Sequence, residues 1–209
     1  MKDSSASIYR QALGTQWDSL HPVIRRHYDL KAGERREVEG ALHVHHTRML
    51  TPILHITARF GLLFPEQGRN VYTTLINEAT VDARGQPVVV WKRCLHFKRP
   101  DGTEHKRRFD SVVKLLPRGA DSLLLEKVAL NQAVAMRLNV DERGALMYES
   151  AGFYTVVGEI LIPVPTPSRL FIREWAHPTE PDRFCMAFQM TLPLLGDVFG
   201  YEGEFKIVS

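Results

Sequence analysis

The sequence is poor in cysteine and has no long apolar segment. Cys94 and Cys185 are the only cysteines in 209 residues, too few for a disulfide framework or a cysteine-rich zinc site. No window approaches the ~18 consecutive apolar residues of a transmembrane helix. The first residues, MKDSSASIYRQ, lack the apolar core of a secretory signal peptide. We therefore expect a cytoplasmic protein in which both cysteines are small buried residues.

The familiar catalytic and nucleotide-binding motifs are also missing. There is no HExxH, no G-x-S-x-G nucleophile elbow, no glycine-rich dinucleotide loop and no P-loop. His43 and His45 alternate onto one face of a strand, a spacing that metal sites use. No third ligand stands beside them in the sequence, so we expect no metal and no cofactor. Catalytic residues cannot be assigned from these patterns, and binding is favoured over catalysis.

Charge is distributed unevenly along the chain. The net charge is +3, yet residues 84–118 contain ten lysines and arginines against three acidic residues, whereas residues 119–209 contain seven against twelve. The basic segment indicates either solvated outer faces or a site for an anionic ligand or partner. Alternation splits its cations between both faces of the expected strands. This split disfavours a continuous nucleic-acid-binding stripe.

Three short helices are predicted before residue 61. The first helix is predicted at residues 7–13, with Ser7 as its N-cap. The second is predicted at residues 22–28, with Pro22 in its first turn. The third helix spans residues 52–60, with Thr51 as its cap and Gly61 after its end. Its apolar composition predicts that it packs on a sheet.

From residue 71 onward the apolar residues recur with period two, which predicts strands. Turn-forming residues at 82–85, 99–102, 117–121 and 141–144 separate neighbouring strands. The expected strands are 38–46, 71–81, 88–98, 104–116, two within 123–140, 146–151, 154–162, 169–176, 183–192 and 199–208. Short turns favour an antiparallel meander that curls to protect its edges. We predict a single domain, 1–209, of the α+β class, β-dominated, with a strongly curved antiparallel sheet or incomplete barrel and a packed helix at 52–60.

Two expected strands place an arginine among aromatic residues. Trp91, Arg93 and Phe97 share one strand face, and Phe171, Arg173 and Trp175 share another. A guanidinium in an apolar row is costly unless its charge is answered. The answer is a carboxylate such as Glu159, Glu174 or Glu202, stacking on the rings at the surface, or a bound anion. The candidate ligand-binding residues are Trp91, Arg93, Phe97, Phe171, Arg173, Glu174, Trp175 and Tyr201.

Several short motifs also occur in a recognisable order. They are Trp91-Lys92-Arg93 with His96-Phe97, Phe109-Asp110-Ser111, Gly158 with Pro163 and Pro165, Arg173-Glu174-Trp175, and the stretch from Pro193 to Phe205. Over nearly its whole length the chain resembles a bacterial family of uncharacterised domains, domain of unknown function 4166. The resemblance implies one compact domain and carries over no catalytic residue. It also implies that relatives are standalone proteins or are attached to saccharopine-dehydrogenase-like NAD-dependent oxidoreductases.

Three functions remain open from the sequence. The first is a binding module whose internal pocket takes a small amphipathic or lipid-like acidic ligand, with Arg93 and Arg173 on the acidic head. The second is an accessory domain that docks on an NAD-dependent oxidoreductase through its basic hairpins. The third is an enzyme in which Glu159, Glu174 or Tyr201 transfers a proton.

Overall fold

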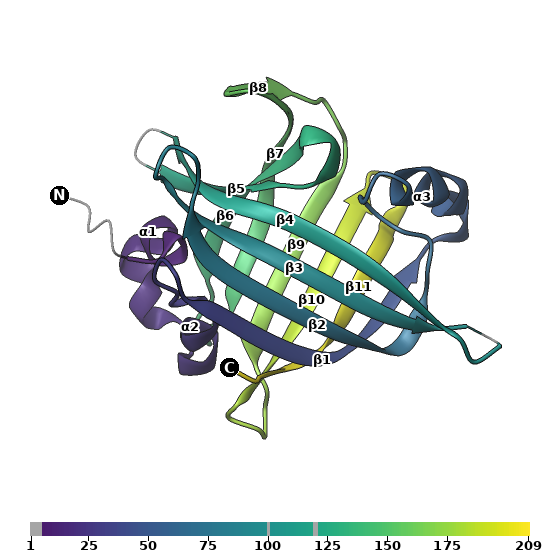
Figure 1. Ribbon diagram of the computed structural model, residues 1–209, viewed down its shortest axis with the longest axis horizontal. Coiled ribbons are helices and arrows are strands. Elements are labelled where there is room, and N and C mark those ends of the chain that lie inside the picture. The colour runs from purple at the N-terminus through teal and green to yellow at the C-terminus, as the bar shows by residue number, and fades with distance from the viewer. Residues whose placement is uncertain (1–5, 100, 119–120) are drawn as a thin grey trace.

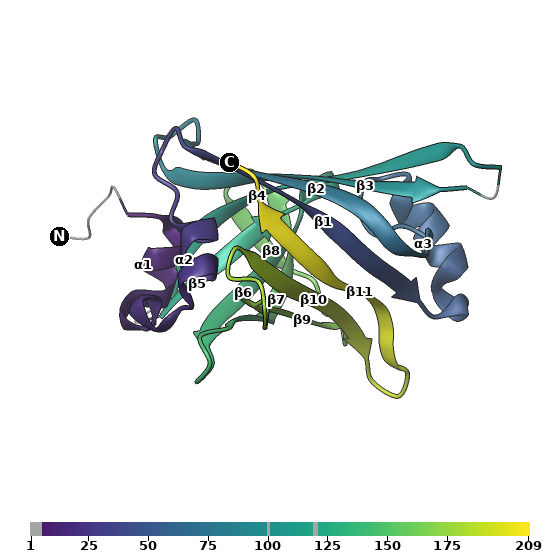
Figure 2. The same ribbon diagram turned by 90° about the horizontal axis from the view of Figure 1, so that it is seen from below.

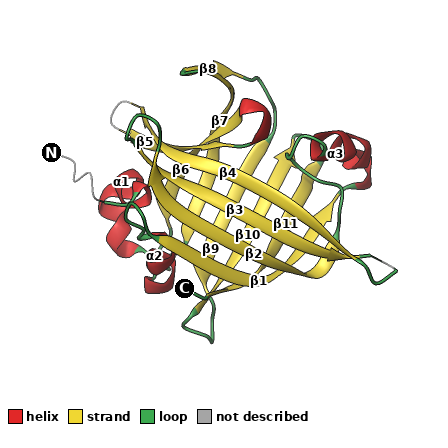
Figure 3. Ribbon diagram, in the orientation of Figure 1, coloured by secondary structure: helices red, strands yellow, loops and turns green. Residues whose placement is uncertain are grey.

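The computed structural model describes residues 6–99, 101–118 and 121–209 (Figure 1). The chain is 57% strand and 17% helix (Figure 3). Ten antiparallel strands close into a barrel, and one further strand lies outside it. The prediction of a β-dominated fold with a strongly curved antiparallel sheet is confirmed, and the sheet closes.

The strands are β1 (Arg35–His46), β2 (Gly68–Val81), β3 (Pro87–Lys98), β4 (Glu104–Arg118), β5 (Asp121–Lys127), β6 (Gln132–Val140), β7 (Leu146–Val157), β8 (Ile160–Pro163), β9 (Arg169–Ala176), β10 (Arg183–Leu192) and β11 (Gly196–Ile207). The α-helices are α1 (Ile8–Leu13), α2 (Pro22–Tyr28) and α3 (Thr51–Ala58), and the short 3-10 helices are η1 (Gly14–Ser19), η2 (Arg48–Leu50) and η3 (Ala129–Asn131). Among the described residues, none of the helices is both long and apolar enough to cross a bilayer.

Most neighbouring strands are also consecutive in the sequence. The order is β6-β5-β4-β3-β2-β1-β11-β10-β9-β7-β8, and β6 also pairs with β7 to complete the ring. Asp82 and Asp141 build two of the turns in the same way, since each carboxylate accepts two backbone N–H groups at 2.9 Å. The predicted turns at 99–102 and 117–121 include Pro100 and residues 119–120, which lie outside the described residues.

The structure differs from the predicted elements at three places. The predicted strand 154–162 is interrupted at Gly158, because β7 ends at Val157 and β8 begins at Ile160. Residues 146–157 form one continuous strand, β7, where we expected a break near Gly152. The break is instead a register shift against β6 between Ala135 and Met136, so the period is interrupted without ending the strand. Thr51 does not cap α3, because Leu50 holds that position without a side-chain hydrogen bond.

Helices cover the two ends of the barrel (Figure 2). At one end, α1, η1 and α2 insert Tyr9, Trp17, Ile24 and Tyr28, all fully buried, into the core. The side chains of these N-terminal helices therefore close one end of the barrel. At the opposite end lies α3, which buries only Leu54. One end of the barrel is thus filled and the other is loosely covered.

The barrel wall has a short seam between β7 and β9. These strands pair only from Leu146 to Glu149. Beyond Glu149, the edge of β7 pairs with β8 from Tyr154 to Val157. Past this pairing, the Leu170 backbone N–H donates to the Ser150 hydroxyl at 3.0 Å. The wall is therefore split near the loosely covered end.

Candidate functional site

A largely apolar cavity of about 330 Å³ lies in the α3 half of the barrel. Its wall side chains come from β3 to β7, from β9 to β11, and from the segments that follow α3, β5 and β8. The lining residues are Thr57, Leu62, Leu63, Phe64, Arg93, Phe109, Glu126, Val128, Gln132, Ala133, Val134, Met136, Phe153, Val164, Thr166, Ser168, Leu170, Ile172, Phe188, Met190, Phe199 and Tyr201. The volume is in the range of small-molecule sites.

A charged network stands in the wall of this cavity. Arg93 on β3 pairs with Glu126 on β5 and donates to the Ser111 hydroxyl on β4 at 2.5 Å. Ser111 in turn donates to the same Glu126 oxygen at 2.7 Å. The guanidinium carbon also lies 4.4 Å from the ring centre of Phe109 and 5.0 Å from that of Trp91. Ring faces and a carboxylate together hold this cation in an apolar interior.

Arg93 keeps its charge despite burial. Burial opposes the charge and would lower the pKa of the guanidinium, but Glu126 and Tyr201 act in the other direction and leave it raised. For the Tyr201 phenol, burial acts in the opposite direction and raises the pKa to about 12, so that group is neutral. The Nε of Arg93 is buried and has no partner among the described residues. With almost no accessible surface, this N–H is enclosed by the wall rather than presented to the cavity.

A second polar cluster lies beyond the cavity, in the closed half of the barrel. Glu174 on β9 is fully buried, and its Oε1 accepts a hydrogen bond of 2.6 Å from Tyr28 of α2. Burial raises the pKa of Glu174 to about 8, so the carboxyl is protonated at neutral pH. Tyr28 stacks over Trp91 and meets the ring edge of Tyr148. Glu174 does not line the cavity. The cluster instead fills the closed half of the barrel.

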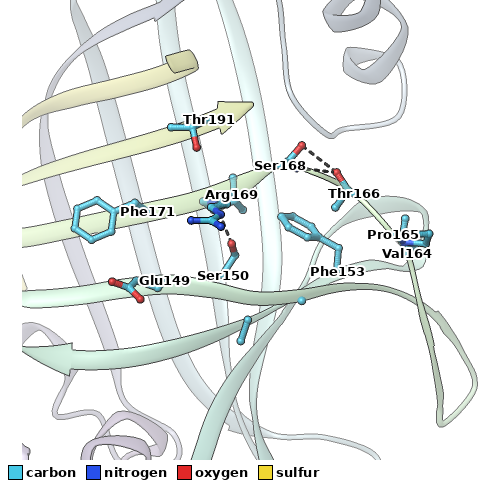
Figure 4. Close-up of a pocket in the computed structure, with 13 residues that line it drawn as sticks. Glu149, Ser150, Phe153, Val164, Pro165, Thr166, Ser168, Arg169, Phe171 and Thr191 are labelled. Carbon is cyan, nitrogen blue, oxygen red and sulfur yellow. Dashed lines mark hydrogen bonds between the residues drawn. The ribbon is translucent and has the colours of Figure 1, made fainter. Parts of the chain in front are cut away.

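The cavity adjoins a groove on the outside of the barrel, at the seam between β7 and β9 (Figure 4). The groove has a volume of about 640 Å³. It shares Phe153, Val164, Thr166, Ser168 and Leu170 with the cavity. The side chains of Phe153 and Leu170 therefore stand between the interior and the surface. We call this place, together with Thr57 and Leu62 at the α3 side, the mouth.

The structure divides the predicted site residues between the two faces of the wall. Trp91, Arg93, Phe97 and Glu174 are buried inside, and Tyr201 lines the cavity. Phe97 packs on Phe64, 5.7 Å between ring centres, behind the lining. The other three, Phe171, Arg173 and Trp175, have the opposite strand parity to Glu174 and face outward. The structure therefore brings Arg93 and Tyr201 together at the cavity and leaves Arg173 outside it.

The expected charge partners of the two arginines were wrong. Arg173 donates to Asp141 at 2.8 Å and lies over the ring of Trp175, so the surface-stacking interpretation holds for it. Arg93 pairs with Glu126 rather than with any of the three carboxylates proposed from the sequence. Glu159 pairs instead with the exposed Arg84. The sequence could not identify Glu126 as the partner of Arg93, because the pairing of β3 with β4 and of β4 with β5 is what brings the two side chains together.

Several site residues were missed because nothing local marks them. Glu126 follows the run Leu123-Leu124-Leu125, and a carboxylate there looks like the end of an apolar strand. Its side chain is nonetheless almost fully buried. Ser111 and Arg93 lie on the two strands of an expected hairpin, which indicates that they are close in space. In the structure Ser111 is opposite Trp91, two residues from Arg93. Phe109 is likewise opposite Arg93. Cross-strand pairing within one hairpin could have found both.

Two histidine groups bear on metal binding. His43 and His45 do share a face, 5.6 Å between ring centres. Among the described residues, the one group of three potential ligands is His177, Cys185 and Glu204. The Nδ1 of His177 accepts the backbone N–H of Glu180 at 3.1 Å, so in the neutral ring Nε2 carries the proton. A protonated Nε2 faces Glu204 as a donor and cannot ligate a metal.

Comparison with known proteins gives a family and no activity. A search among curated proteins finds no match. Residues 20–205, nearly the whole chain, match the family described as "Domain of unknown function (DUF4166)". This range contains α2, whose Tyr28 contacts Glu174, and all the barrel strands except the last two residues of β11. The chain therefore belongs to the DUF4166 family.

Proposed function

We propose that this barrel is a binding module for a small amphipathic, lipid-like molecule. The observation that carries the proposal is the apolar cavity with the Arg93–Glu126–Ser111 network in its wall. Leu63, Met136, Ile172 and Met190 offer the apolar body of the ligand a dry surface. Arg93, Gln132 and Tyr201, which also line the cavity, offer its polar head hydrogen-bonding groups.

The charge of the network bears on the kind of head group. Arg93 and Glu126 already neutralise each other. A second carboxylate would leave one buried negative charge uncompensated, which is costly. A neutral acceptor such as a hydroxyl, an ester or an amide adds no charge. We therefore propose that a neutral head group fits better than the acidic head inferred from the sequence.

Native mass spectrometry of freshly purified protein tests for a bound molecule. A displacement assay then tests the site, using the uncharged fluorophore N-phenyl-1-naphthylamine against oleyl alcohol, monoolein and oleic acid. We expect fluorophore uptake and displacement by the two neutral lipids at lower concentration than by oleic acid. Wild-type protein that takes up neither the fluorophore nor any of the lipids would refute the proposal.

Two variants localise the binding. Val134→Phe fills the cavity from its wall and should abolish fluorophore uptake, at a packing cost of about 1–3 kcal/mol. Val81→Phe adds the same volume at an exposed site at the far end of β2 and should leave uptake unchanged. In the double variant Arg93→Met/Glu126→Leu, apolar residues replace the ion pair, a change that proteins often tolerate. We expect it to weaken displacement by monoolein about tenfold, the equivalent of one lost hydrogen bond.

The two alternative functions have less support in the described residues. The accessory-domain function relies on the basic hairpins, where acidic residues already neutralise two of the cations, because Lys92 pairs with Glu78 and Arg107 with Glu66. The enzymatic function needs an accessible proton-transfer group. Glu174 has the pKa for that role but is sealed from the cavity by the closed half of the barrel.

A further inference from the structure

Exposed apolar side chains are concentrated at the end of the barrel where the mouth lies. Met49, Ile53, Ile56 and Phe60 are between 47% and 62% exposed. Their spacing of four, three and four residues places them on one stripe along η2, α3 and the turn that follows. Leu54 is buried in the core, and Thr57 lines the cavity. The helix that covers the mouth therefore turns a second apolar face outward.

Two neighbouring turns extend this stripe. Leu194 and Leu195 form the tip of the β10–β11 turn, and Leu194 is fully exposed. Leu130 of η3 is also exposed. Figure 2 shows the β10–β11 turn and α3 at the same end of the molecule, opposite α1 and α2. The Thr47 N–H donates to the Val198 carbonyl at 2.9 Å and ties the start of η2 to β11. We call Met49, Ile53, Ile56, Phe60, Leu130, Leu194 and Leu195 the mouth patch.

The backbone holds two of these leucines outward at a cost. Leu130 has φ 54° and Leu194 has φ 69°. Non-glycine residues seldom adopt this left-handed region, and strain of this kind collects at functional sites. A glycine, asparagine or aspartate would relieve the strain in either turn. The sequence instead keeps two apolar side chains there in full or partial contact with solvent.

The charge around the stripe is mainly positive. Between Glu39 and Glu66 the sequence contains no aspartate and no glutamate. The same interval contains Arg48 and Arg59, both exposed, and Arg69 is exposed three residues beyond Glu66. Asp197, beside the β10–β11 turn, is the nearby exposed acid. Helices that combine an exposed apolar face with cations and lack acids lie flat on anionic bilayers.

We infer that the mouth patch docks on a membrane surface containing anionic phospholipid. The inference rests on the proposed function in one respect, because the docked face is the one through which a lipid-like ligand would enter the cavity. The apolar stripe of α3 and the leucines of the two turns enter the headgroup region. Arg48 and Arg59 contact lipid phosphates. The ligand then passes from bilayer to cavity without crossing bulk water.

Flotation of the intact protein with phosphatidylcholine vesicles, with and without phosphatidylglycerol, tests the docking. We expect association with the anionic vesicles and little with the neutral ones. Ile53→Ser/Ile56→Ser should weaken association about tenfold or more, because two exposed isoleucines no longer enter the bilayer. Arg48→Gln/Arg59→Gln should weaken it roughly fivefold for each arginine. The matched control Val81→Ser/Val208→Ser removes exposed valines at the other end and should float like wild type.

The outcomes separate this inference from the proposed function. Wild-type protein that takes up N-phenyl-1-naphthylamine in solution but ignores anionic vesicles would overturn the docking and leave the cavity function intact. Ile53→Ser/Ile56→Ser protein that floats normally would also overturn it. If Ile53→Ser/Ile56→Ser protein also loses fluorophore uptake, flotation of Leu194→Ser/Leu195→Ser protein tests the docking instead, because neither leucine lines the cavity. Normal flotation of that variant would overturn the docking. A dimer in gel filtration that the same substitutions dissociate, without flotation of wild type, would assign the patch to a second copy and overturn the membrane assignment.

Discussion

Replacing Glu174 with glutamine tests whether the closed half of the barrel contains a protonated carboxyl group. The side chain is fully buried, Tyr28 donates to its Oε1, and its Oε2 has no partner among the described residues. Burial raises its pKa from 4.5 to about 8. Glutamine has the same shape and can accept the same Tyr28 hydrogen bond. The substitution therefore removes the ionisation and keeps the packing.

The sign of the pH dependence follows from the direction of this shift. Between pH 4.5 and pH 8 the unfolded chain releases the Glu174 proton while the folded protein retains it. The free energy of unfolding therefore falls as pH rises through this window. At about 1.4 kcal/mol per pH unit, the loss between pH 5 and pH 7.5 is about 3 kcal/mol. Glu174→Gln should match wild type near pH 5 and exceed its stability by about that amount at pH 7.5.

Urea unfolding followed by tryptophan fluorescence at a series of pH values measures this difference. Glu149→Gln, on the exposed face of the neighbouring strand β7, is the matched control and should retain the wild-type slope. Wild-type and Glu174→Gln curves that run parallel from pH 5 to pH 8 would refute the reasoning. Such a result would mean that the carboxyl of Glu174 titrates equally in the folded and unfolded states.

Two further substitutions probe the wall of the barrel. Glu126→Ala leaves the buried Arg93 without its counter-charge, and we expect a loss of about 3–5 kcal/mol in urea unfolding; a loss under 1 kcal/mol would show that the pair is effectively solvated. Gly203→Ala places a Cβ 2.0 Å from the Ala41 carbonyl oxygen, so we expect a loss of about 3 kcal/mol or more. Gly85→Ala, where the added Cβ meets open space but φ is 74°, should cost only about 1 kcal/mol and serves as its comparison.

The sequence predicted the strands well because their period is undisturbed. Arg169–Ala176 and Arg183–Leu192 are strands with the predicted bounds. Period two also places Arg173 with Phe171 and Trp175 on one face. It cannot say which face is interior, because residues 170–175 place two large apolar residues and one charged residue on each face. Leu170, Ile172 and Glu174 turned out to face the core.

The interior site depended on contacts that sequence spacing does not reveal. Glu126 reaches Arg93 across two strand pairings, β3 with β4 and β4 with β5. Tyr28 reaches Glu174 from a helix 146 residues away. The sequence shows that Arg93 and Glu174 stand among apolar strand residues, so the cost of burying an ionisable group at either position could be anticipated. The partner that compensates it is fixed only by the register and closure of the barrel.

The four-residue pairing of β7 with β9 has a kinetic consequence. Local opening needs few broken hydrogen bonds there, so the seam should separate at a free energy well below that of global unfolding. Amide hydrogens of Leu170 and its neighbours should then exchange with solvent faster than those in the long β2–β3 pairing. We expect such opening of the split wall to admit and release the proposed ligand while the rest of the barrel stays folded. If opening of the seam limits release, stronger hydrogen bonds in the seam should lengthen the residence time of the proposed ligand.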